Sequence, residues 1–586
     1  MMITGPFIFK EVWAVDTEFH PANGKEGNLP VVVCMVAREL QSGRTIQLWQ
    51  DDLYNLEAPP FSVDNDSLFV AFFAPAELLI FLTLGWQMPK NVLDLFVAFR
   101  MQTNGTKPPF GRGLIGALHY FGLGAISAEE KTEMRELILS GGPWSEQAKL
   151  EILNYCESDV VALGELLPAM SPYMDWPRVL YQCRYTKSVA AMEFNGIPID
   201  KVSLQVALTH WKDIQIELIR RIDSEFGVYE GTSFKTERFA GFLNRNNISW
   251  PRLASGALDL QDDTFKSMCR SNPKLNPLRE LRSELSKFRL ASLTVGDDSR
   301  NRCMLSMFSS KTGRNQPSTS KFIFSLSAWA RGFVKPQEGC SLVYVDWSQQ
   351  EFGIAAALSK DEAMMAAYHS SDPYLSFAIL AGAVPATATK QTHPLQREQF
   401  KQCLLGVQFG MGAQSLASRI NGSEARAKEL LAMHRKTFKK YWTWSEGVMN
   451  HALLEKKLWT VFGWQLRVEE ASNARSLCNF PMQANGSEML RLACTYLVEN
   501  DIKVCAPIHD AILIEVRTVD LEATVAKAQD LMRQASEVIL PGFPLKSDAK
   551  VVSYPNRYID QRGIQMWDEV MDLLGLPGNK ARDEDA

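Results

Sequence analysis

The chain has 586 residues, of which 46% are hydrophobic and 22% charged, and its formal net charge is −5. This length exceeds what one hydrophobic core supports, so we expect roughly two to four domains. The acidic balance excludes a uniformly basic nucleic-acid binder, so binding to a polyanion would need a local basic surface. The ten cysteines include no CxxC pair, and residues 1–10 lack the pattern of a secretory signal. We therefore expect a cytoplasmic protein without disulfides or zinc knuckles.

The N-terminal region alternates short apolar runs with helical patterns over about 170 residues, which is typical of an α/β domain. Strands are predicted at 13–15 and 30–36, and helices at 114–121 and 148–167. The apolar stretch 69–86 is nearly long enough to cross a bilayer, but Pro75 and Glu77 interrupt it. We predict a strand followed by a helix there, with a transmembrane helix as the alternative.

A mostly helical region is predicted from 179 to 293. Its segment 266–289 carries seven Lys or Arg residues against two Glu residues. Such a segment is either a solvated helix face or a contact with a phosphate backbone. The following residues predict a buried strand at 342–345 that ends at Asp346, helices over 355–450, and a hairpin at 504–516.

Four polar residues of the N-terminal region are spaced so that they share faces of predicted elements. Asp16 and Glu18 follow a predicted strand, where residues two apart point the same way, so both carboxylates could hold one Mg²⁺ ion. Tyr155 and Asp159 are four residues apart in a predicted helix and are therefore neighbours. Each pair taken alone also fits a solvated strand end or helix surface.

Two further carboxylates occupy unusual places in the second half of the chain. Asp346 lies at the end of a predicted buried strand, and Asp510 lies in the tight turn of the predicted hairpin. Burying a carboxylate costs free energy, although either residue alone also fits a turn or a cap. Together they could bind a pair of Mg²⁺ ions on the phosphates of a nucleotide.

A predicted helix between these two carboxylates carries a mixed stripe. Arg397, Lys401 and Leu405 recur every four residues on one face, with Phe409 one turn further. The cations suit a triphosphate and the apolar side chains suit a base and a sugar. The alternative is an amphipathic helix with two surface cations, one of them paired with Glu398.

These segments, taken in order over residues 180–555, resemble the motifs of family A DNA polymerases. Asp346-Trp347-Ser348-Gln349-Gln350-Glu351 is similar to motif A, Arg397-x3-Lys401-x3-Leu405-Gly406-x2-Phe409-Gly410 to motif B, and Ile508-His509-Asp510 to motif C. Thr312-Gly313-Arg314, Arg475-x3-Asn479-x3-Gln483 and Met192-Glu193-x-Asn195-Gly196 are similar to the primer-end segment, the minor-groove helix and the start of the thumb.

The N-terminal pairs resemble the first and third motifs of the DEDD exonucleases, a family in which carboxylates from three motifs bind two metal ions. The second motif is usually Asn with Asp four residues later, and its best match is Phe73 with Glu77. Because a site displaced by 1 Å can lose about 100-fold in rate, the exonuclease fold is better supported than full exonuclease activity.

The resemblance implies roles for named residues. The catalytic residues would be Asp346, Asp510 and Lys401 in the polymerase and Asp16, Glu18, Tyr155 and Asp159 in the exonuclease. The metal ligands would be Asp346 and Asp510 in one site and Asp16, Glu18, Glu77 and Asp159 in the other. The nucleotide-binding residues would be Arg397, Lys401, Leu405, Phe409, Glu351, Tyr374 and Gln349. The DNA-binding residues would be Arg314, Arg475, Asn479, Gln483, His509, Arg289 and Lys287.

The implied fold class is α/β plus α+β. A ribonuclease H-like 3′–5′ exonuclease domain would occupy residues 1–175, and a right-hand polymerase domain would occupy 176–586. Within the latter we expect the thumb at approximately 180–310, the palm at approximately 311–360 and 460–586, and the fingers at approximately 361–459. We expect no 5′-nuclease domain before the exonuclease.

The implied cofactor is Mg²⁺, two ions per active site, with Mn²⁺ as a substitute. The implied partners are primer–template DNA, dNTPs and replisome proteins, with no membrane. Leu405 stands where the family has an aromatic residue and Phe409 where it has Tyr, so nucleotide choice should be altered. Such departures indicate a divergent, phage or prophage type of enzyme in a bacterial or infected-host cytoplasm.

The predicted function is therefore a DNA-directed DNA polymerase with a 3′–5′ proofreading exonuclease, acting in DNA replication. Three alternatives stay open: a single-subunit RNA polymerase, a nucleic-acid-binding replication subunit built on an inactive polymerase, and an exonuclease with a vestigial polymerase domain. Nucleotide incorporation on a primed template, and the preference between ribonucleotides and deoxyribonucleotides, distinguish these alternatives.

Overall fold

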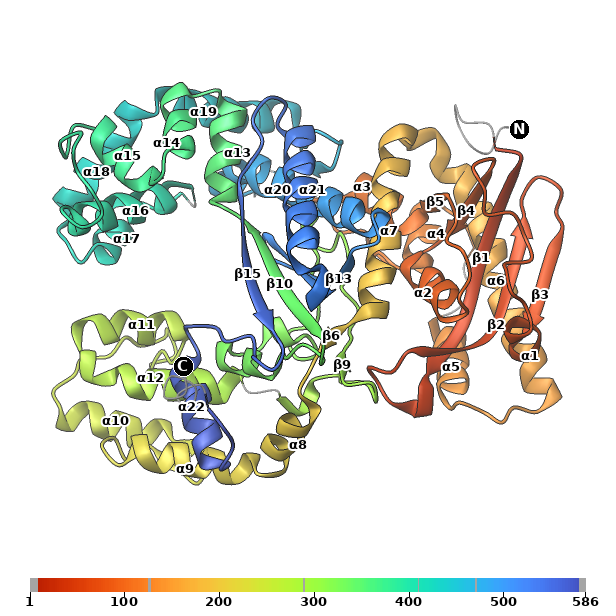
Figure 1. The fold of residues 1–586 in the computed structure, drawn as a ribbon, viewed down its shortest axis with the longest axis horizontal. Helices are drawn as coiled ribbons and strands as arrows, with labels where there is room; N and C mark the ends of the chain where they lie inside the picture. Colours follow the sequence, from red (N-terminus) through yellow and green to blue (C-terminus); the bar gives the residue numbers. More distant parts are fainter. Residues whose placement is uncertain (1–8, 125–127, 288–289, 409, 470–471, 579–586) are drawn as a thin grey trace. The chain divides into compact units, whose positions relative to one another are not determined.

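The computed structural model describes residues 9–124, 128–287, 290–408, 410–469 and 472–578 (Figure 1). The chain forms two compact units. Unit 1 comprises Met1–Gly196, Met304–Gln316 and Ser341–Val551, and unit 2 comprises Ile197–Cys303, Pro317–Cys340 and Val552–Ala586. These units are defined by compact packing, and neither begins or ends between residues 175 and 176. The expected boundary between an exonuclease and a polymerase domain at that point stays a prediction.

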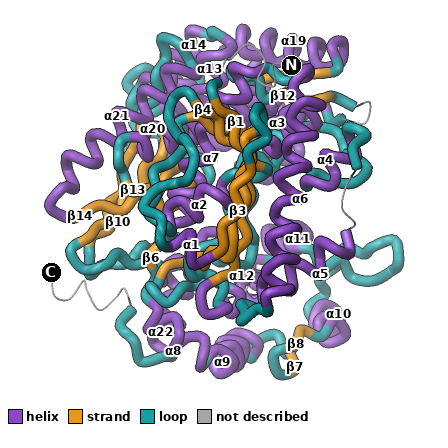
Figure 2. The backbone as a smooth tube through the Cα atoms, turned by 90° about the vertical axis from the view of Figure 1, so that its right-hand side faces the viewer, coloured by secondary structure: helices purple, strands orange, loops and turns teal. Residues whose placement is uncertain are grey.

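The N-terminal part of unit 1 is built on a mixed sheet with the strand order β3-β2-β1-β4-β5. The strands are β1 (Glu11–Pro21), β2 (Pro30–Glu39), β3 (Thr45–Trp49), β4 (Ser67–Ala71) and β5 (Asn91–Asp94). The central strand β1 is antiparallel to β2 and parallel to β4. Figure 2 shows this sheet from the side of the N-terminus.

Helices cover this sheet because its strands alternate buried side chains between two faces. Trp13 and Val15 of β1 pack with Leu78 and Phe81 of α2 (Pro75–Thr83) and Ala190 of α7 (Trp176–Asn195). The long helix α6 (Glu146–Met170) also packs on β1 and β2. The other helices of this part are α1 (Gln50–Tyr54), α3 (Leu95–Thr103), α4 (Leu114–Tyr120) and α5 (Ala128–Leu139).

The predicted elements of this region are confirmed. The stretch 69–86 forms β4 and α2, with Pro75 at the start of the helix, where its missing N–H is not needed. Among the described residues, no helix has the length and apolar character needed to span a membrane.

A second sheet has the strand order β13-β14-β10-β15. Its strands are β10 (Cys340–Trp347), β13 (Lys503–Ile508), β14 (Ala511–Arg517) and β15 (Ser547–Ser553). In Figure 1, β10 and β15 run side by side, and α20 (Ala474–Glu499) and α21 (Leu521–Ile539) lie beside this sheet. The hairpin prediction is confirmed, but the prediction that the strand ends at Asp346 is wrong, because β10 continues to Trp347.

The predicted helical region at 355–450 is confirmed, and its described residues, which omit 409, form seven helices. They are α13 (Gln350–Ser359), α14 (Glu362–His369), α15 (Pro373–Leu380), α16 (Pro394–Gln408), α17 (Ala413–Arg419), α18 (Glu424–Thr437) and α19 (Lys439–Glu455). A short hairpin of β11 (Lys457–Trp459) and β12 (Gln465–Arg467) follows and leads into α20.

Unit 2 is mostly helical, as predicted for the region after residue 179. Its helices are α8 (Lys201–Thr209), α9 (Trp211–Asp223), α10 (Thr236–Arg245), α11 (Asp262–Ser271), α12 (Asn276–Lys287) and α22 (Ile564–Leu573). Two small ribbons join β6 (Ile197–Pro198) to β9 (Arg300–Asn301) and β7 (Tyr229–Glu230) to β8 (Ser233–Phe234). Its core includes Phe239 stacked on Phe265, with Trp250 edge-on to both.

Short 3-10 turns complete both units. They are Ala22–Gly24, Ser171–Tyr173, Pro273–Leu275, Leu290–Ser292, Ile323–Ser325, Ala328–Phe333 and Thr518–Asp520.

Candidate active sites

The first candidate site lies on the central strand β1. Asp16, Glu18 and Cys156 each bring one possible ligand atom, and these atoms all lie within 4.8 Å of one another. The Cys156 thiol lies 3.4 Å from Oδ2 of Asp16. Burial, together with the charge of Asp159, raises the pKa of Asp16 to about 8. The site therefore concentrates negative charge that a bound cation would offset.

The predicted helix residues lie at the same place. Asp159 is one turn after Tyr155 on α6, and its charge acts on Asp16 and Glu18. Nζ of Lys131, on α5, lies 2.8 Å from Oδ2 of Asp159 and 5.7 Å from the centre of the Tyr155 ring. Sequence reasoning missed Lys131, because nothing local links a lysine in a polar helix to a carboxylate 28 positions later.

Glu77 joins this cluster from the first turn of α2. Its side chain is buried, and its Oε2 has no hydrogen-bond partner among the described residues. Burial, and then the charge of Asp16, raise the pKa of Glu77 well above its usual range. The structure thus brings Glu77 close to Asp16 and Glu18, although Phe73 and Glu77 depart from the usual second motif.

Asp94 is a structural member of the site that the sequence analysis overlooked. It is fully buried at the end of β5 and accepts hydrogen bonds from the backbone N–H groups of Phe73 and Ala74, each at 2.9 Å. These bonds hold Phe73 in the left-handed region, at φ 73°. Asp94 also caps α3 by accepting a hydrogen bond from the N–H of Phe96. The sequence could have indicated Asp94 as a cap, because it stands between an apolar strand and a helix.

A cavity of about 520 Å³ opens beside these groups, a volume in the usual range for ligand sites. Asp16 and Asp159 line it together with two cations, Arg112 and Lys131. The remaining wall consists of aromatic and apolar side chains and part of a distant segment: Phe72, Phe73, Phe96, Gly113, Leu114, Leu163, Met304, Ser306 and Ser309. Carboxylates, cations and rings in one cavity suit a nucleotide.

The second candidate site lies on the sheet that contains β10. Asp346 is half-buried on β10, which has β14 on one side and β15 on the other. Burial, and then the charges of Asp510 and Asp548, raise the pKa of Asp346 to about 7. Its Oδ1 is buried and has no hydrogen-bond partner among the described residues. Such an arrangement of carboxylate oxygens fits divalent cations.

Asp548 was not found from the sequence. It lies on β15, and its Oδ2 accepts a hydrogen bond from Oγ of Ser348 at 2.5 Å. Only the pairing of β15 with β10 brings this carboxylate to Asp346. The polar strand 547–553 has no apolar alternation that would have singled it out.

The hairpin turn positions Asp510. His509 has φ 59°, and only two residues separate β13 from β14. Positive φ in two-residue turns matches the twist of antiparallel strands, and Asn or Gly usually supplies it. A histidine in this conformation is uncommon, and such strain concentrates at functional positions.

Glu351 brings several predicted residues together in the first turn of α13. Its Oε1 lies 3.7 Å from Nη2 of Arg314. Burial raises the pKa of Glu351, and the Arg314 charge and a hydrogen bond from Gln483 oppose this effect. Asp510 acts on the same carboxylate. Four residues predicted from four separate segments are therefore neighbours. Gln349, just before α13, has φ 48°.

The stripe on α16 lies on one face, as predicted. Arg397, Lys401 and Leu405 are half-buried, whereas Phe400 and Leu404, which flank the stripe on the same helix, are fully buried. Phe409 lies outside the described residues.

Both cations of this stripe have acidic neighbours. Arg397 forms an ion pair with Asp372, and its guanidinium lies 5.3 Å from the centre of the Tyr374 ring. Lys401 lies 3.7 Å from Glu398, the pairing that the alternative interpretation named. Asp372, which was missed, caps α15 through the N–H groups of Tyr374 and Leu375.

The predicted DNA-contact residues of α20 recur at every fourth position. Arg475 is exposed near its start, and Asn479 and Gln483 are half-buried. A Cβ atom on Gly410 would lie only 2.6 Å from Cγ of Arg475, so the glycine permits close approach to the end of the α16 motif.

The basic segment of unit 2 forms α11 and α12. Arg279 lies 3.4 Å from Asp262, and Arg282 donates a hydrogen bond to the Leu260 carbonyl at 2.7 Å. These two cations are therefore engaged within unit 2, whereas Lys266 and Lys274 are exposed. The side chain of Lys287, and Arg289 as a whole, lie outside the described residues.

Comparisons with known proteins agree on one family. Residues 324–554 match the model of DNA polymerase family A. The chain is 23% identical over 446 residues to DNA polymerase I of Aquifex aeolicus, covering 68% of this chain and 75% of that protein. It is 27% identical over 229 residues to the thermostable DNA polymerase I of Thermus aquaticus, covering 37% of this chain and 26% of that protein.

A solved structure resembles almost the whole chain. It is the POL domain of Pol1 from M. smegmatis in complex with a DNA primer-template and dNTP. The TM-score is 0.71 at 17% identity, with 92% of this chain and 94% of that chain covered. At this identity the similarity concerns the fold.

The matched region contains the carboxylates Asp346 and Asp510 with the stripe of α16 between them, in the order that the motifs predicted. The family match and the similar fold agree, and residues 324–554 of the chain belong to DNA polymerase family A.

Proposed function

We propose that this family A DNA polymerase extends a primer at the site of Asp346 and Asp510 and removes primer 3′ ends at the site on β1. One observation supports the polymerase site most strongly. The buried, unpartnered Oδ1 of Asp346 lies in a carboxylate cluster with Asp510 and Asp548, whose repulsion raises the pKa of Asp346. Such a cluster of carboxylates suits an external divalent cation.

The ligands at each site are hard oxygen donors, which Mg²⁺ prefers and Mn²⁺ also accepts. Asp346 and Asp510 would hold two ions in the polymerase, and Asp16, Glu18, Glu77 and Asp159 would hold two in the exonuclease. Two such ions supply Lewis-acid stabilisation of the attacking and leaving oxygens of an in-line displacement.

Protein side chains would bind the incoming dNTP from α16. Arg397 offers a planar fork and Lys401 a compact charge to the phosphates, and Lys401 would protonate the departing pyrophosphate. The pair between Arg397 and Asp372 must open for this, so Asp372 holds the guanidinium ready beside Tyr374. Leu405 would offer apolar surface to the base.

Glu351 would lie under the sugar of the incoming nucleotide. Its neighbours Arg314 and Gln483 come from the segments assigned to the primer end and the minor groove. A half-buried carboxylate that already has these partners leaves little room for a 2′-hydroxyl, which favours deoxyribonucleotides. Gln349, His509, Arg475 and Asn479 would contact the nucleotide or the template–primer duplex nearby.

The proofreading site would use residues from β1, α2 and α6. Glu77 supports this proposal, since one of its buried oxygens has no hydrogen-bond partner among the described residues and the charges of Asp16 and Glu18 act on its carboxyl group. Tyr155 would orient the attacking water, as the resemblance implies. Residues 1–175 would form the ribonuclease H-like domain, and the mixed sheet with its carboxylates on the central strand agrees with that.

The remaining proposals concern organisation and partners. The thumb would occupy 180–310, the palm 311–360 and 460–586, and the fingers 361–459. Primer–template DNA and dNTPs would be substrates, with replisome proteins as partners, in the cytoplasm of a bacterium or of its infected host. The basic helices α11 and α12 would contact the phosphate backbone, with Lys266 and Lys274 available for it.

Primer extension and primer shortening by three proteins test this function. The wild type, Asp346→Ala and Asp16→Ala are each assayed in Mg²⁺ with and without dNTPs. We expect Asp346→Ala to lose extension and keep shortening, and Asp16→Ala to do the reverse. A wild type that shortens the primer and never extends it would refute the polymerase proposal, and one that only extends it would refute proofreading.

A further inference from the structure

Residues 304–316, here called the shared segment, pack in unit 1, whereas the chain on both sides of them belongs to unit 2. The structure describes the shared segment in full, and it contains no helix or strand. Its shape therefore depends on side chains from elsewhere in unit 1.

The first anchors come from α3, in the exonuclease-like region. Nε and Nη2 of Arg100 donate hydrogen bonds to the carbonyls of Phe308 and Ser309 at 2.9 and 3.0 Å. Nδ2 of Asn104 donates to the carbonyl of Lys311 at 2.7 Å. The Arg100 side chain is only 3% exposed, and no carboxylate of the described residues forms an ion pair with it.

The Arg100 guanidinium also lies over the Trp464 ring, 6.0 Å from its centroid. A buried guanidinium without a carboxylate partner is costly to fold. Burial lowers the pKa of Arg100 to about 10. Arg100 thus uses its charge to hold the backbone of another segment in a fixed position.

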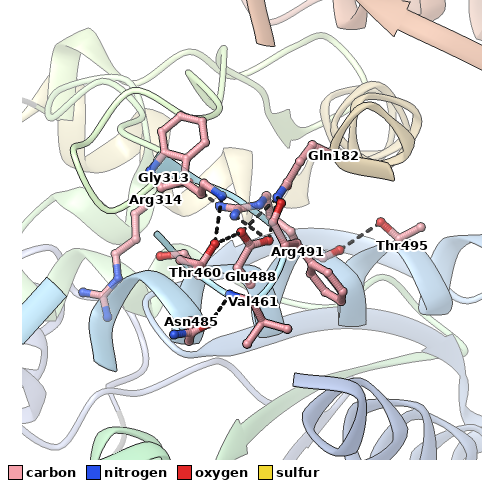
Figure 3. A network of polar contacts seen from close by, with 12 residues as sticks. Gln182, Gly313, Arg314, Thr460, Val461, Asn485, Glu488, Arg491 and Thr495 are labelled. Atoms are coloured by element: carbon pink, nitrogen blue, oxygen red, sulfur yellow. Dashed lines mark hydrogen bonds and ion pairs between the residues drawn. The ribbon is translucent and has the colours of Figure 1, made fainter. Parts of the chain in front are cut away.

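The second set of anchors comes from α20 and is drawn in Figure 3. Nη1 of Arg491 donates a hydrogen bond to the Gly313 carbonyl at 2.6 Å, and Nη2 lies 3.0 Å from Oε2 of Glu488. Gln182 and Thr460 both donate to Glu488, which completes its hydrogen bonding. In Figure 3 the Arg314 side chain extends away from this buried network.

The backbone of the shared segment needs such support. Ser306 and Phe308 have φ values of 49° and 54°, a region that side chains other than Gly rarely adopt. Phe308 is fully buried against Trp464, with ring centroids 5.2 Å apart. Anchored strain of this kind keeps a backbone in one conformation.

The two ends of the shared segment reach the two candidate sites. Met304, Ser306 and Ser309 line the cavity that contains Asp16 and Asp159. Arg314 lies 3.7 Å from Glu351 beside the polymerase carboxylates. One stretch of 13 residues therefore contributes to both sites.

We propose that the shared segment is a common wall for the primer strand in both sites, and that Arg100 is a positioning residue that sets this wall. Ser306 and Ser309 would contact the 3′-terminal nucleotide in the exonuclease cavity, and Arg314 would contact the primer end during synthesis. This inference rests on the proposed function, because both sites are assigned there. A change at Arg100 shifts both ends of the wall.

The test compares variants at the two ends with variants at the anchor. Ser309→Ala acts on excision and Arg314→Ala on extension, because each lies at one end. Arg100→Met keeps the volume and loses the donors, Arg100→Lys restores a single donor group, and Asn104→Ala removes the neighbouring anchor. Arg533→Met is the matched control, since Arg533 is exposed on α21 and pairs only within that helix.

Two assays are run on protein whose active-site concentration has been titrated. Primer extension gives KM for primer–template and kcat, and the second assay gives the rate of excision from a single-stranded oligonucleotide. Since a displacement of 1 Å can cost about 100-fold, we expect Arg100→Met to raise KM for primer–template and to slow excision, each by about 10-fold. The value of kcat should change less, and Arg100→Lys should recover part of both losses.

The inference would be overturned if Arg100→Met had the melting temperature of the wild type and changed both KM for primer–template and the excision rate by less than about 2-fold. A lost positioning contact costs more than that. If Arg100→Met does not fold, Arg100→Lys and Asn104→Ala must show the coupled loss in its place. A wild type without excision would refute the exonuclease proposal alone, because KM for primer–template would still decide whether Arg100 positions Arg314.

Discussion

The two carboxylate sites of this chain differ in how their negative charge is compensated. On β1, burial raises the pKa of Asp16 to about 8, and Lys131 lies within the cluster at Asp159. On β10, burial and two acidic neighbours raise the pKa of Asp346 to about 7. The nearby cation Arg314 is directed to another carboxylate, Glu351.

This difference indicates how each site is prepared for its substrate. In the site on β1, Lys131 is an internal counterion beside Asp159. In the site on β10, the charges that act on Asp346 are those of Asp510 and Asp548, so the proposed metal ions would supply its compensation. Two sites built from the same kinds of side chain can therefore respond differently to metal ions, and variants can separate them.

The largest expected effect is on extension, at Asp510. Asp510→Asn removes a charge that a divalent cation needs, and several kcal/mol of lost transition-state stabilisation corresponds to at least about 1000-fold in kcat. Single-turnover extension with saturating dNTP measures it. Asp501→Asn, on an exposed turn near the same hairpin, serves as the control. Equal rates for Asp510→Asn and the wild type would exclude Asp510 from the metal site.

The next effect would test the internal counterion. Lys131→Met leaves Asp159 without its partner beside other carboxylates, so we expect the free energy of unfolding in EDTA to fall by about 3 kcal/mol. Mg²⁺ should restore most of this loss, because it replaces the missing positive charge. Urea unfolding with and without Mg²⁺ provides the measurement.

Lys149→Met is the control for this prediction, because Lys149 pairs with an exposed Glu146 one turn away on α6. Its effect should stay below about 1 kcal/mol, as for other surface pairs. If Lys131→Met lost no more stability than this control, or lost the same amount in Mg²⁺ as in EDTA, the comparison of the two sites would be wrong.

The pH dependence of stability tests a buried group whose pKa is shifted by burial alone, in contrast to the carboxylates, whose pKa values are also raised by mutual repulsion. His434 is buried beside Phe377 and Phe438, accepts a hydrogen bond from Trp442, and has its pKa lowered from 6.5 to about 3 by burial alone. The unfolded chain binds a proton near pH 6.5 and the folded chain does not. Stability from this group is therefore present above pH 6.5 and falls as the pH drops toward 3.

Between pH 7 and pH 5 the His434 contribution should fall by about 2 kcal/mol, since each unit of pH between the two pKa values is about 1.4 kcal/mol. Urea unfolding at both pH values, for the wild type and for His434→Asn, isolates it by difference. An unchanged pH dependence in His434→Asn would contradict a buried neutral imidazole.

The smallest expected effect concerns nucleotide binding on α16. Leu405→Phe places a ring where the family usually has one, and aromatic contacts add about 1 kcal/mol beyond area, which is about 5-fold in affinity. We expect KM for dNTP to fall by this factor, with excision unchanged. Leu395→Phe, on the exposed start of the same helix, is the control. A KM that rises in Leu405→Phe would place the base elsewhere.

Much of the local structure was predictable because its signals are local. Apolar runs predicted β1, β2, β4 and the hairpin of β13 and β14, and four-residue spacing predicted the stripe of α16. The strand end at Asp346 was misplaced by one residue, since a polar side chain on a strand does not interrupt its backbone hydrogen bonding. The ordered motifs predicted the family, which the comparisons confirm.

The missed residues share one property: each contacts a partner that is distant in the sequence or acts through the backbone. Asp548 approaches Asp346 because β15 pairs with β10, and Lys131 reaches Asp159 across two helices. Asp94 shapes the second exonuclease motif by bonding to backbone N–H groups, which no side-chain pattern reveals.

The sequence by itself determined the elements, the family and the main carboxylates, because spacing along one strand or helix sets which side chains share a face. Only the tertiary structure decided how the charges are compensated, and it placed the shared segment along both sites. Pairing between strands and long-range hydrogen bonds joins residues by position in space, and no local period in the sequence encodes that position.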